Sequence, residues 1–147
     1  MKITSTAFEN NQPIPAKYTC QGENINPQLR FDGIPSSSKS LVLIMHDPDA
    51  PISGGWTHWT IINMDPTTVG IEENAKPGSG TEAGTNFGKP GYGGPCPPSG
   101  THRYFFKLYA LDTMLELSPQ VDKAAIEGAM KEHVIDQAEL VGLYSKS

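Results

Sequence analysis

The sequence lacks the features that mark membrane proteins, secreted proteins and nucleic-acid-binding proteins. No stretch approaches the roughly 18 consecutive apolar residues that a membrane-spanning helix needs. The first residues, MKITSTAFENNQPIPAKY, have no apolar segment behind a basic start, so no signal peptide is expected. Lys and Arg form no run and the net charge is −5, whereas nucleic-acid binding depends on neutralising phosphates. We therefore expect a cytoplasmic protein without an integral membrane segment and without a nucleic-acid partner.

Cysteine is scarce, and the common catalytic and metal-binding motifs are missing. The two cysteines, Cys20 and Cys96, lack the paired C-x-x-C spacing of a zinc site, so each is expected to be a buried or half-buried thiol. A disulfide between them is possible but is not demonstrated by the sequence, and a reducing cytosol would disfavour it. No G-x-S-x-G motif is present to expose a serine nucleophile.

The composition is that of a globular protein. The chain has 147 residues, of which 37% are hydrophobic and 18% are charged. This length is enough for one domain with one substantial core, so we predict a single domain over residues 1–147. No internal repeat is found.

Short apolar runs rich in β-branched and aromatic residues dominate the first three quarters of the chain, and they predict strands. The clearest are 40–47, 57–64 and 102–111, and weaker candidates are 3–8 and 27–34.

The segment 65–101 is different, because its 37 residues include nine Gly and six Pro. A connection this long inside a domain is uncommon and is often functional. A disordered insertion is one interpretation. The closely spaced prolines and the aromatic pair in FGKPGYGGPCPPSG (87–100) favour a specific, rigid path instead.

Helix signals appear only near the C-terminal end. Ser118 followed by Pro119 is a good N-cap and first helical residue, and apolar residues then recur on one helical face. A second short helix is expected over 133–137, followed by a final strand over 140–145. Strands first and helices at one end predict a mostly β sandwich with one or two short helices near the C-terminus.

Strand alternation indicates which polar side chains meet in HDPDAPISGGWTHW, residues 46–59. Asp47 continues the apolar row of its strand, while His46 points to the opposite face. In the next strand, alternation places His58 on the face opposite to Trp59. We expect Asp47 and His58 to lie together at the tip of a hairpin.

The strand that follows the long segment adds two more candidates. His102 and Tyr104 share one face, opposite to Arg103, and His102 begins its strand. Polar groups at strand ends can gather at one end of a sandwich above an apolar floor, which is the usual anatomy of a small-ligand site. Three further polar residues are expected to be structural: Asp49 as a turn residue, His46 on the opposite face, and His133 on a helix.

Several of these stretches resemble the phosphatidylethanolamine-binding protein family, in particular its short bacterial and archaeal branch, called Raf-kinase-inhibitor-like. The resemblance is carried by DPDAP (47–51), GGWTHWTIINM (54–64) and GYGGPCPPSGTHRYFF (91–106). YTCQGENINPQL (18–29) and HVIDQAELVGLYS (133–145) are similar to the two ends of that branch. Nearly the whole chain is covered.

The resemblance implies a Greek-key β-sandwich of two antiparallel sheets, with a small pocket for phosphate-type anions, including phospholipid head groups. It also implies that the backbone around 94–96 closes one side of the pocket. Arg103 matches the family motif, but strand alternation points it away from the pocket, so we expect it to form a structural ion pair. The site residues that the resemblance implies are Asp47, Trp56, His58, Pro98, His102 and Tyr104.

The chain also departs from the family's animal members. Those members close the pocket with a tyrosine from a C-terminal helix, whereas Gln137 or Ala138 occupies that region here. The loop before His102 is also shorter. Kinase regulation, known from the animal members, is therefore not carried over to this chain.

We predict a small-anion binding protein, not an enzyme, with no cofactor and with a regulatory role as the expected use. A protease-inhibitor or signalling-interaction protein is the alternative, and a homodimer is expected because short members are often dimers. A metal-dependent hydrolase is a further alternative, in which Asp47, His58 and His102 hold a divalent ion or His102 acts as a general base.

Overall fold

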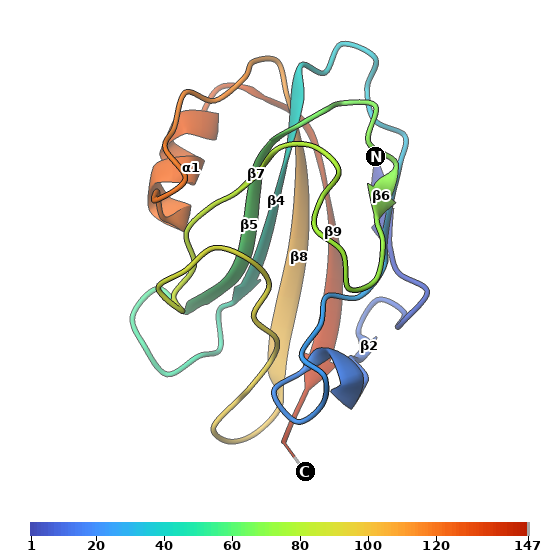
Figure 1. The fold of residues 1–147 in the computed structure, drawn as a ribbon, viewed down its shortest axis with the longest axis vertical. Coiled ribbons are helices and arrows are strands. Elements are labelled where there is room, and N and C mark those ends of the chain that lie inside the picture. The colour runs from blue at the N-terminus through green and yellow to red at the C-terminus, as the bar shows by residue number, and fades with distance from the viewer. Residues whose placement is uncertain (147) are drawn as a thin grey trace.

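The computed structural model describes residues 1–146 and contains two sheets packed face to face (Figure 1). A six-stranded sheet has the order β2-β9-β8-β4-β5-β7, and a three-stranded sheet has the order β1-β3-β6. The predicted mostly β sandwich is confirmed; its pairings are antiparallel except for a two-residue parallel contact of β2 with β9. The elements are β1 Lys2–Thr4, β2 Gln12–Pro13, η1 Ala16–Tyr18, β3 Leu29–Asp32, β4 Ser40–Asp47, β5 Trp56–Met64, β6 Gly70–Ile71, β7 Thr81–Glu82, β8 His102–Leu111, α1 Lys123–Met130 and β9 Val134–Tyr144.

Alternation along the strands builds two apolar clusters, one on each face of the larger sheet. In β4, Leu41, Leu43 and Met45 face the smaller sheet and contribute to the cluster between the two sheets. Val42 and Ile44 face the other way, into a second cluster that α1 covers with Ile126 and Met130. The remaining large side chains of the inter-sheet cluster include Ile3, Leu29, Phe31, Trp59, Ile61, Met64, Phe106 and Leu108.

The helix starts later than the sequence predicted. Its N-cap is Asp122, whose side chain accepts a hydrogen bond from the Ala125 amide at 2.9 Å. Ser118 begins only a turn, closed by the Val121 amide. The Val121 carbonyl then accepts from the Gly84 amide at 3.0 Å, so it is taken by a neighbouring loop and not by a helical amide. A tertiary hydrogen bond therefore sets where this helix begins.

The predicted second helix over 133–137 is wrong, because these residues lie at or in the start of β9. The backbone leaves the helical region after α1, with φ of 70° at Glu132, and β9 then pairs with β8 from Val134 to Tyr144. Pairing with a ten-residue neighbour satisfies the backbone groups of this stretch, and the β-branched Val134 and Ile135 suit a strand. His133 is therefore not helical, and its ring pairs with Asp112 at 2.8 Å.

The Gly- and Pro-rich segment 65–101 follows a defined path, as its prolines predicted. It contains the short strands β6 and β7 and then runs along the free edge of β5. Ala83 and Asn86 donate backbone hydrogen bonds to Thr60 and Thr57 of β5 at 2.9 and 3.0 Å, and Gly93 donates to His58 at 3.1 Å. The segment thereby covers the edge of the sheet and returns the chain to the start of β8.

No helix within residues 1–146 is long and apolar enough to cross a membrane.

The turn between β4 and β5 contains two glycines in the left-handed region that differ in their surroundings. Gly54 has φ of 83° and Gly55 has φ of 74°. A Cβ on Gly54 would meet nothing within 4 Å, whereas a Cβ on Gly55 would lie 2.4 Å from the Asp47 carbonyl oxygen and 2.7 Å from His46 Nε2. Only Gly55 is needed for a close approach of the two strands.

The two glycines allow a matched test. Gly54→Ala should lower the free energy of unfolding by about 1–2 kcal/mol, because it carries only the strain of a positive φ. Gly55→Ala should lower it by a further ~1–3 kcal/mol, because the methyl group overlaps backbone atoms of β4. Urea unfolding of both variants measures the difference, and equal losses would contradict the close packing at Gly55.

Candidate functional site

A cavity of about 290 Å³ opens at the end of the sandwich where β4 ends and where β5 and β8 begin. All six site residues predicted from the sequence line this one cavity, together with residues from the 48–55 turn and the 65–101 segment. The lining residues are Asp47, Ala50, Pro51, Ile52, Trp56, His58, Phe87, Cys96, Pro97, Pro98, His102 and Tyr104.

Asp47 and His102 form a buried pair on the floor of the cavity. His102 Nδ1 lies 2.6 Å from Asp47 Oδ2, and because a carboxylate only accepts, the imidazole nitrogen is the donor. The other carboxylate oxygen accepts from the Asp49 amide at 2.8 Å. Asp47 is thus held from both sides, and it fixes the His102 ring so that Nε2 remains for other partners.

An extra residue in β5 places His58 beside this pair. Met45 pairs with Trp59, but the next pair is His46 with Thr57, so His58 has no partner on β4 and forms a β-bulge. With regular pairing, His58 would have faced His46 on the outer side of the sheet. Instead Thr57 takes that place and its hydroxyl lies 3.1 Å from His46 Nδ1.

The bulge corrects one sequence-based expectation. Trp59 was predicted to face away from Asp47 and His58, but it lies in the same inter-sheet cluster as Met45. Its indole nitrogen donates to Glu82 Oε2 at 2.8 Å. His46 does lie on the opposite face, as predicted, and simple alternation failed only where the register shifts.

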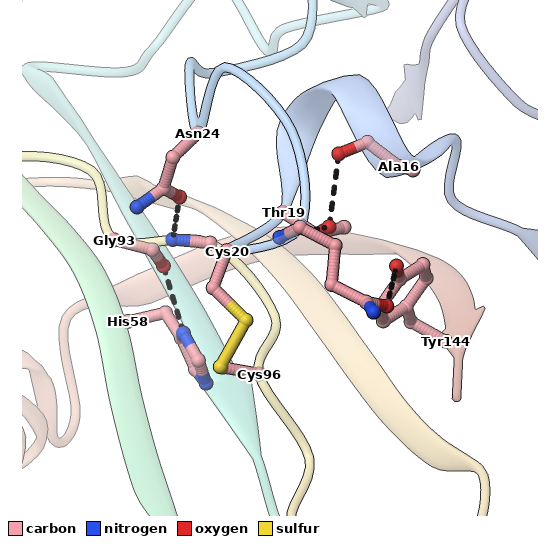
Figure 2. Close-up of a disulfide and its surroundings, with 10 residues drawn as sticks. Ala16, Thr19, Cys20, Asn24, His58, Gly93, Cys96 and Tyr144 are labelled. Atoms are coloured by element: carbon pink, nitrogen blue, oxygen red, sulfur yellow. Dashed lines mark hydrogen bonds between the residues drawn. A yellow bond between two sulfur atoms is a disulfide. The ribbon is translucent and has the colours of Figure 1, made fainter. Parts of the chain in front are cut away.

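A backbone carbonyl sets the hydrogen-bonding state of His58. The ring nitrogen Nδ1 lies 2.7 Å from the Gly93 carbonyl oxygen, which only accepts, so Nδ1 carries the proton (Figure 2). Burial lowers the pKa of His58 to about 4, although the Gly93 carbonyl and the Asp47 carboxylate partly oppose the shift. At neutral pH the ring is therefore neutral, with the lone pair on Nε2.

Tyr104 contributes a buried hydroxyl without a partner. Its ring contacts that of His58 at 5.2 Å and stacks over that of His102 at 6.4 Å. Among residues 1–146, its hydroxyl is the only buried side-chain nitrogen or oxygen without a hydrogen bond. Burial and then the nearby Asp47 charge raise the pKa of Tyr104, so the hydroxyl keeps its proton. Tyr104 thus brings a protonated hydroxyl without a hydrogen-bond partner to the lining of the cavity.

The walls of the cavity are apolar, and the sequence revealed them only in part. Trp56 and Pro98 were predicted, but Phe87 and Ile52 were not. The Phe87 ring contacts Trp56 and His58, each at 5.4 Å between ring centres, and stays partly exposed at the rim. For Phe87, the available signal was an aromatic residue within a Gly- and Pro-rich segment, which indicates a side chain with a specific place to pack.

Arg103 points away from the cavity and forms the ion pair that was expected of it. Its partner is Asp49, whose carboxylate accepts from the Arg103 backbone amide and from two guanidinium nitrogens at 2.8–2.9 Å. Asp49 is therefore more than a turn residue, because it ties the β4–β5 turn to the start of β8. The hydrogen bonds from Arg103 lower the pKa of Asp49 to about 2.

The wall formed by the 65–101 segment is tied to the N-terminal part of the chain by a disulfide between Cys20 and Cys96 (Figure 2). The expectation of two thiols is thus wrong, because the Cα atoms lie 5.5 Å apart, within reach of a disulfide. Asn24 accepts from the Gly94 amide at 2.8 Å, and the Cys20 amide donates to the Pro95 carbonyl at 3.1 Å. These bonds hold the Gly93 carbonyl in position for His58.

No group of three or more His, Cys, Asp or Glu residues suited to a metal ion occurs in the part of the chain that the structure describes. Asp47, His58 and His102 do line one cavity, but Asp47 binds His102 directly, and His58 turns its Nδ1 to a backbone carbonyl.

The sequence model of the family described as phosphatidylethanolamine-binding protein matches residues 4–145. The chain belongs to the phosphatidylethanolamine-binding protein family. Its relatives in this family include a UPF0098 protein of Methanothermobacter thermautotrophicus, which is 49% identical over 99% of both chains. A UPF0098 protein of Pyrococcus horikoshii is 48% identical over 97% of this chain and 75% of the relative.

Solved structures of the phosphatidylethanolamine-binding protein family share the fold. A homologue from Chlamydia trachomatis matches with a TM-score of 0.94 and 43% identity, covering 99% of this chain and 97% of the other. E. coli YbcL, described as a new member of the mammalian family, matches with a TM-score of 0.93 and 28% identity, covering 99% and 98%. The whole sandwich, including the end that carries the cavity, thus lies within the family fold.

Replacing Arg103 by Gln tests the ion pair at the edge of the site. The Asp49 carboxyl should then titrate near its ordinary pKa of about 3.9 instead of about 2. Because the folded-state pKa is below the unfolded one, the pair stabilises the fold above pH ~4 and loses its effect as pH falls towards ~2. Carboxyl NMR titration measures the shift. The Asp65 carboxyl, whose pKa is lowered by Thr67, is an internal control that should not move.

Reduction of the disulfide should destabilise the protein markedly. The bond closes a loop with a sequence separation of 76, for which chain entropy predicts a loss of about 4.5 kcal/mol. Urea unfolding with and without a phosphine reductant measures it. The double variant C20S/C96S should match the reduced protein and should not respond to reductant, and an unchanged midpoint on reduction would show that the bond contributes little.

Proposed function

We propose that this protein binds a small phosphate-type anion in the cavity and acts as a binding protein, not as an enzyme. The observation that carries the proposal is the buried Tyr104 hydroxyl, a protonated donor without a partner inside the cavity. A buried polar group without a partner is unfavourable, so such a group indicates a ligand that completes it. Membership of a family described as phosphatidylethanolamine-binding supports the same class of ligand.

The charges around the cavity fit a binding role. Asp47 is occupied by His102 and by the Asp49 amide, so it orients an imidazole ring and is not free to attack a substrate. The Tyr104 hydroxyl has no partner and can donate to a phosphate oxygen, and a hydrogen bond to a charged oxygen is short and strong. The apolar walls exclude water around these contacts and strengthen them.

A hydrolase remains the alternative of another class, with His102 as a general base oriented by Asp47. The hydrogen bond between these two residues is the observation that favours it. Metal analysis of the purified protein and incubation with phosphate esters separate the two proposals. A stoichiometric metal ion, or release of phosphate that His102→Asn abolishes, would favour the enzyme.

Other aspects of the biological role are predictions as well. The homodimer and a regulatory or inhibitory protein partner are expected from the family, and light scattering tests the dimer. The cytoplasmic location is also a proposal. The structure contains the Cys20–Cys96 disulfide. Disulfides are more common in proteins of oxidising compartments, but intracellular proteins of hyperthermophiles also contain many.

Tyr104→Phe should separate ligand binding from folding. The variant should bind inorganic phosphate at least ~10-fold more weakly, because a hydrogen bond to a charged group is lost. Its free energy of unfolding without ligand should be unchanged or higher, because the hydroxyl without a partner is removed. Calorimetric titration and urea unfolding measure the two effects.

Tyr109→Phe is the matched control, since Tyr109 lies on β8 but in the cluster on the other face of the sheet. It should leave phosphate affinity unchanged. The double variant His58→Ala with His102→Ala should abolish binding, and phosphate binding that persists in this variant would contradict the proposed site.

A further inference from the structure

We propose that the cavity selects a phosphate group that carries a proton, and that His58 makes this selection by accepting that proton at Nε2. The inference rests on the proposed function and deepens it, because it names the chemical form of the ligand. Inorganic phosphate would bind, as would phosphate monoesters at a pH near or below their second pKa of about 6. Sulfate and phosphate diesters have no proton on oxygen near neutral pH and would be rejected.

The first step of the argument is the tautomer of His58. A carbonyl oxygen cannot donate, so the 2.7 Å contact of Nδ1 with the Gly93 carbonyl requires a proton on Nδ1. A neutral imidazole has one protonated nitrogen, so Nε2 then carries a lone pair. Figure 2 shows Nε2 on the side of the ring away from Gly93, and no hydrogen bond joins it to residues 1–146.

The second step concerns the charge of the ring. The groups that face it are Asp47 from β4 and His102 and Tyr104 from β8, while His46 lies on the outer side of the sheet. Asp47 favours the protonated ring, but it is also engaged by His102. Burial outweighs its attraction and lowers the pKa of His58 to about 4. Near pH 7 the ring is an acceptor.

The third step concerns the hydrogen-bonding groups that the ligand must offer. Tyr104 provides a donor, and His58 provides an acceptor in the same cavity. A phosphate with one P–OH group matches both, since its charged oxygen accepts from Tyr104 and its hydroxyl donates to Nε2. An anion without a proton brings an oxygen lone pair against the Nε2 lone pair, and it can bind well only if His58 is first protonated.

The magnitude of this selection follows from the pKa. An anion that binds only when His58 is protonated must first add a proton to a group with a pKa of about 4. This requirement lowers its affinity by about 10³-fold at pH 7 and by about 10-fold at pH 5. Sulfate is fully deprotonated over this range, whereas inorganic phosphate keeps at least one proton. The preference for phosphate over sulfate should therefore fall by about 100-fold from pH 7 to pH 5. A change of charge elsewhere in the cavity would act on both anions, so the ratio of their affinities removes its effect.

The test is a calorimetric titration of the intact protein with phosphate and sulfate at pH 7 and pH 5. Phosphate binding at pH 7 with sulfate at least ~100-fold weaker, and a smaller preference at pH 5, is the expected result. Equal affinity for both anions at pH 7 would overturn the inference and leave the proposed function in place. Failure of both anions to bind would overturn the proposed function itself.

A second pair of probes distinguishes the sources of the phosphate. Methyl phosphate should bind at pH 6, near the second pKa of a monoester, whereas dimethyl phosphate and glycerophosphoethanolamine, both diesters, should bind at least ~10-fold more weakly. That outcome would identify a free phosphate or phosphomonoester as the ligand type. Tighter binding of the diesters would overturn the inference and would favour a lipid head group.

The tautomer can be observed without mutation. Nitrogen-15 NMR of the histidine rings should show His58 neutral with its proton on Nδ1 at pH 7, and a proton on Nε2 in the free protein would contradict the inference. His58→Gln supplies an amide donor at this place, so sulfate and phosphate affinities should move together. His133→Gln, a change at an exposed histidine outside the cavity, should keep the preference of the unmodified protein.

Discussion

The candidate site depends on one extra residue in β5. Between the Met45–Trp59 pair and the His46–Thr57 pair, β5 advances by two residues while β4 advances by one. The bulge allows Trp59 to fill the inter-sheet cluster while His58, its immediate neighbour, faces Asp47 and Tyr104. In a regular strand these two neighbours would point to opposite faces, and the cavity would lose one of its two imidazoles.

The bulge alone does not set the chemistry of His58; the Gly- and Pro-rich segment does. Its Gly93 carbonyl accepts the proton of Nδ1, and its Gly93 amide donates to the His58 carbonyl. Cys96 and Gly94 anchor this part of the segment to the N-terminal region through the disulfide and a side-chain amide. This long connection thus forms a wall of the cavity, and its backbone fixes the tautomer of His58.

Desolvation favours the neutral form of both groups that remain for a ligand, Tyr104 and His58. Burial raises the pKa of Tyr104 and lowers the pKa of His58, so both are neutral near pH 7. The cavity thus presents neutral dipoles beside one carboxylate that is already paired with His102. A ligand that enters must bring its own charge and both a donor and an acceptor. This arrangement supports the proposed binding role.

The sequence by itself predicted the sandwich, its main strands and six of the residues that line the cavity. Local alternation and turn residues indicated the strands and most of the polar residues, and the family resemblance added Trp56 and Pro98. Local patterns failed where distant segments decided the outcome. The Val121 carbonyl accepts a hydrogen bond from the Gly84 amide, so the helix begins only after this residue. Pairing with β8 places residues 134–137 in a strand and not in a helix. The disulfide and the Gly93 contact likewise join residues far apart in the chain, and the bulge at His58 depends on how β5 pairs with β4. Only the tertiary structure could decide them, because each depends on a partner whose distance no sequence pattern encodes.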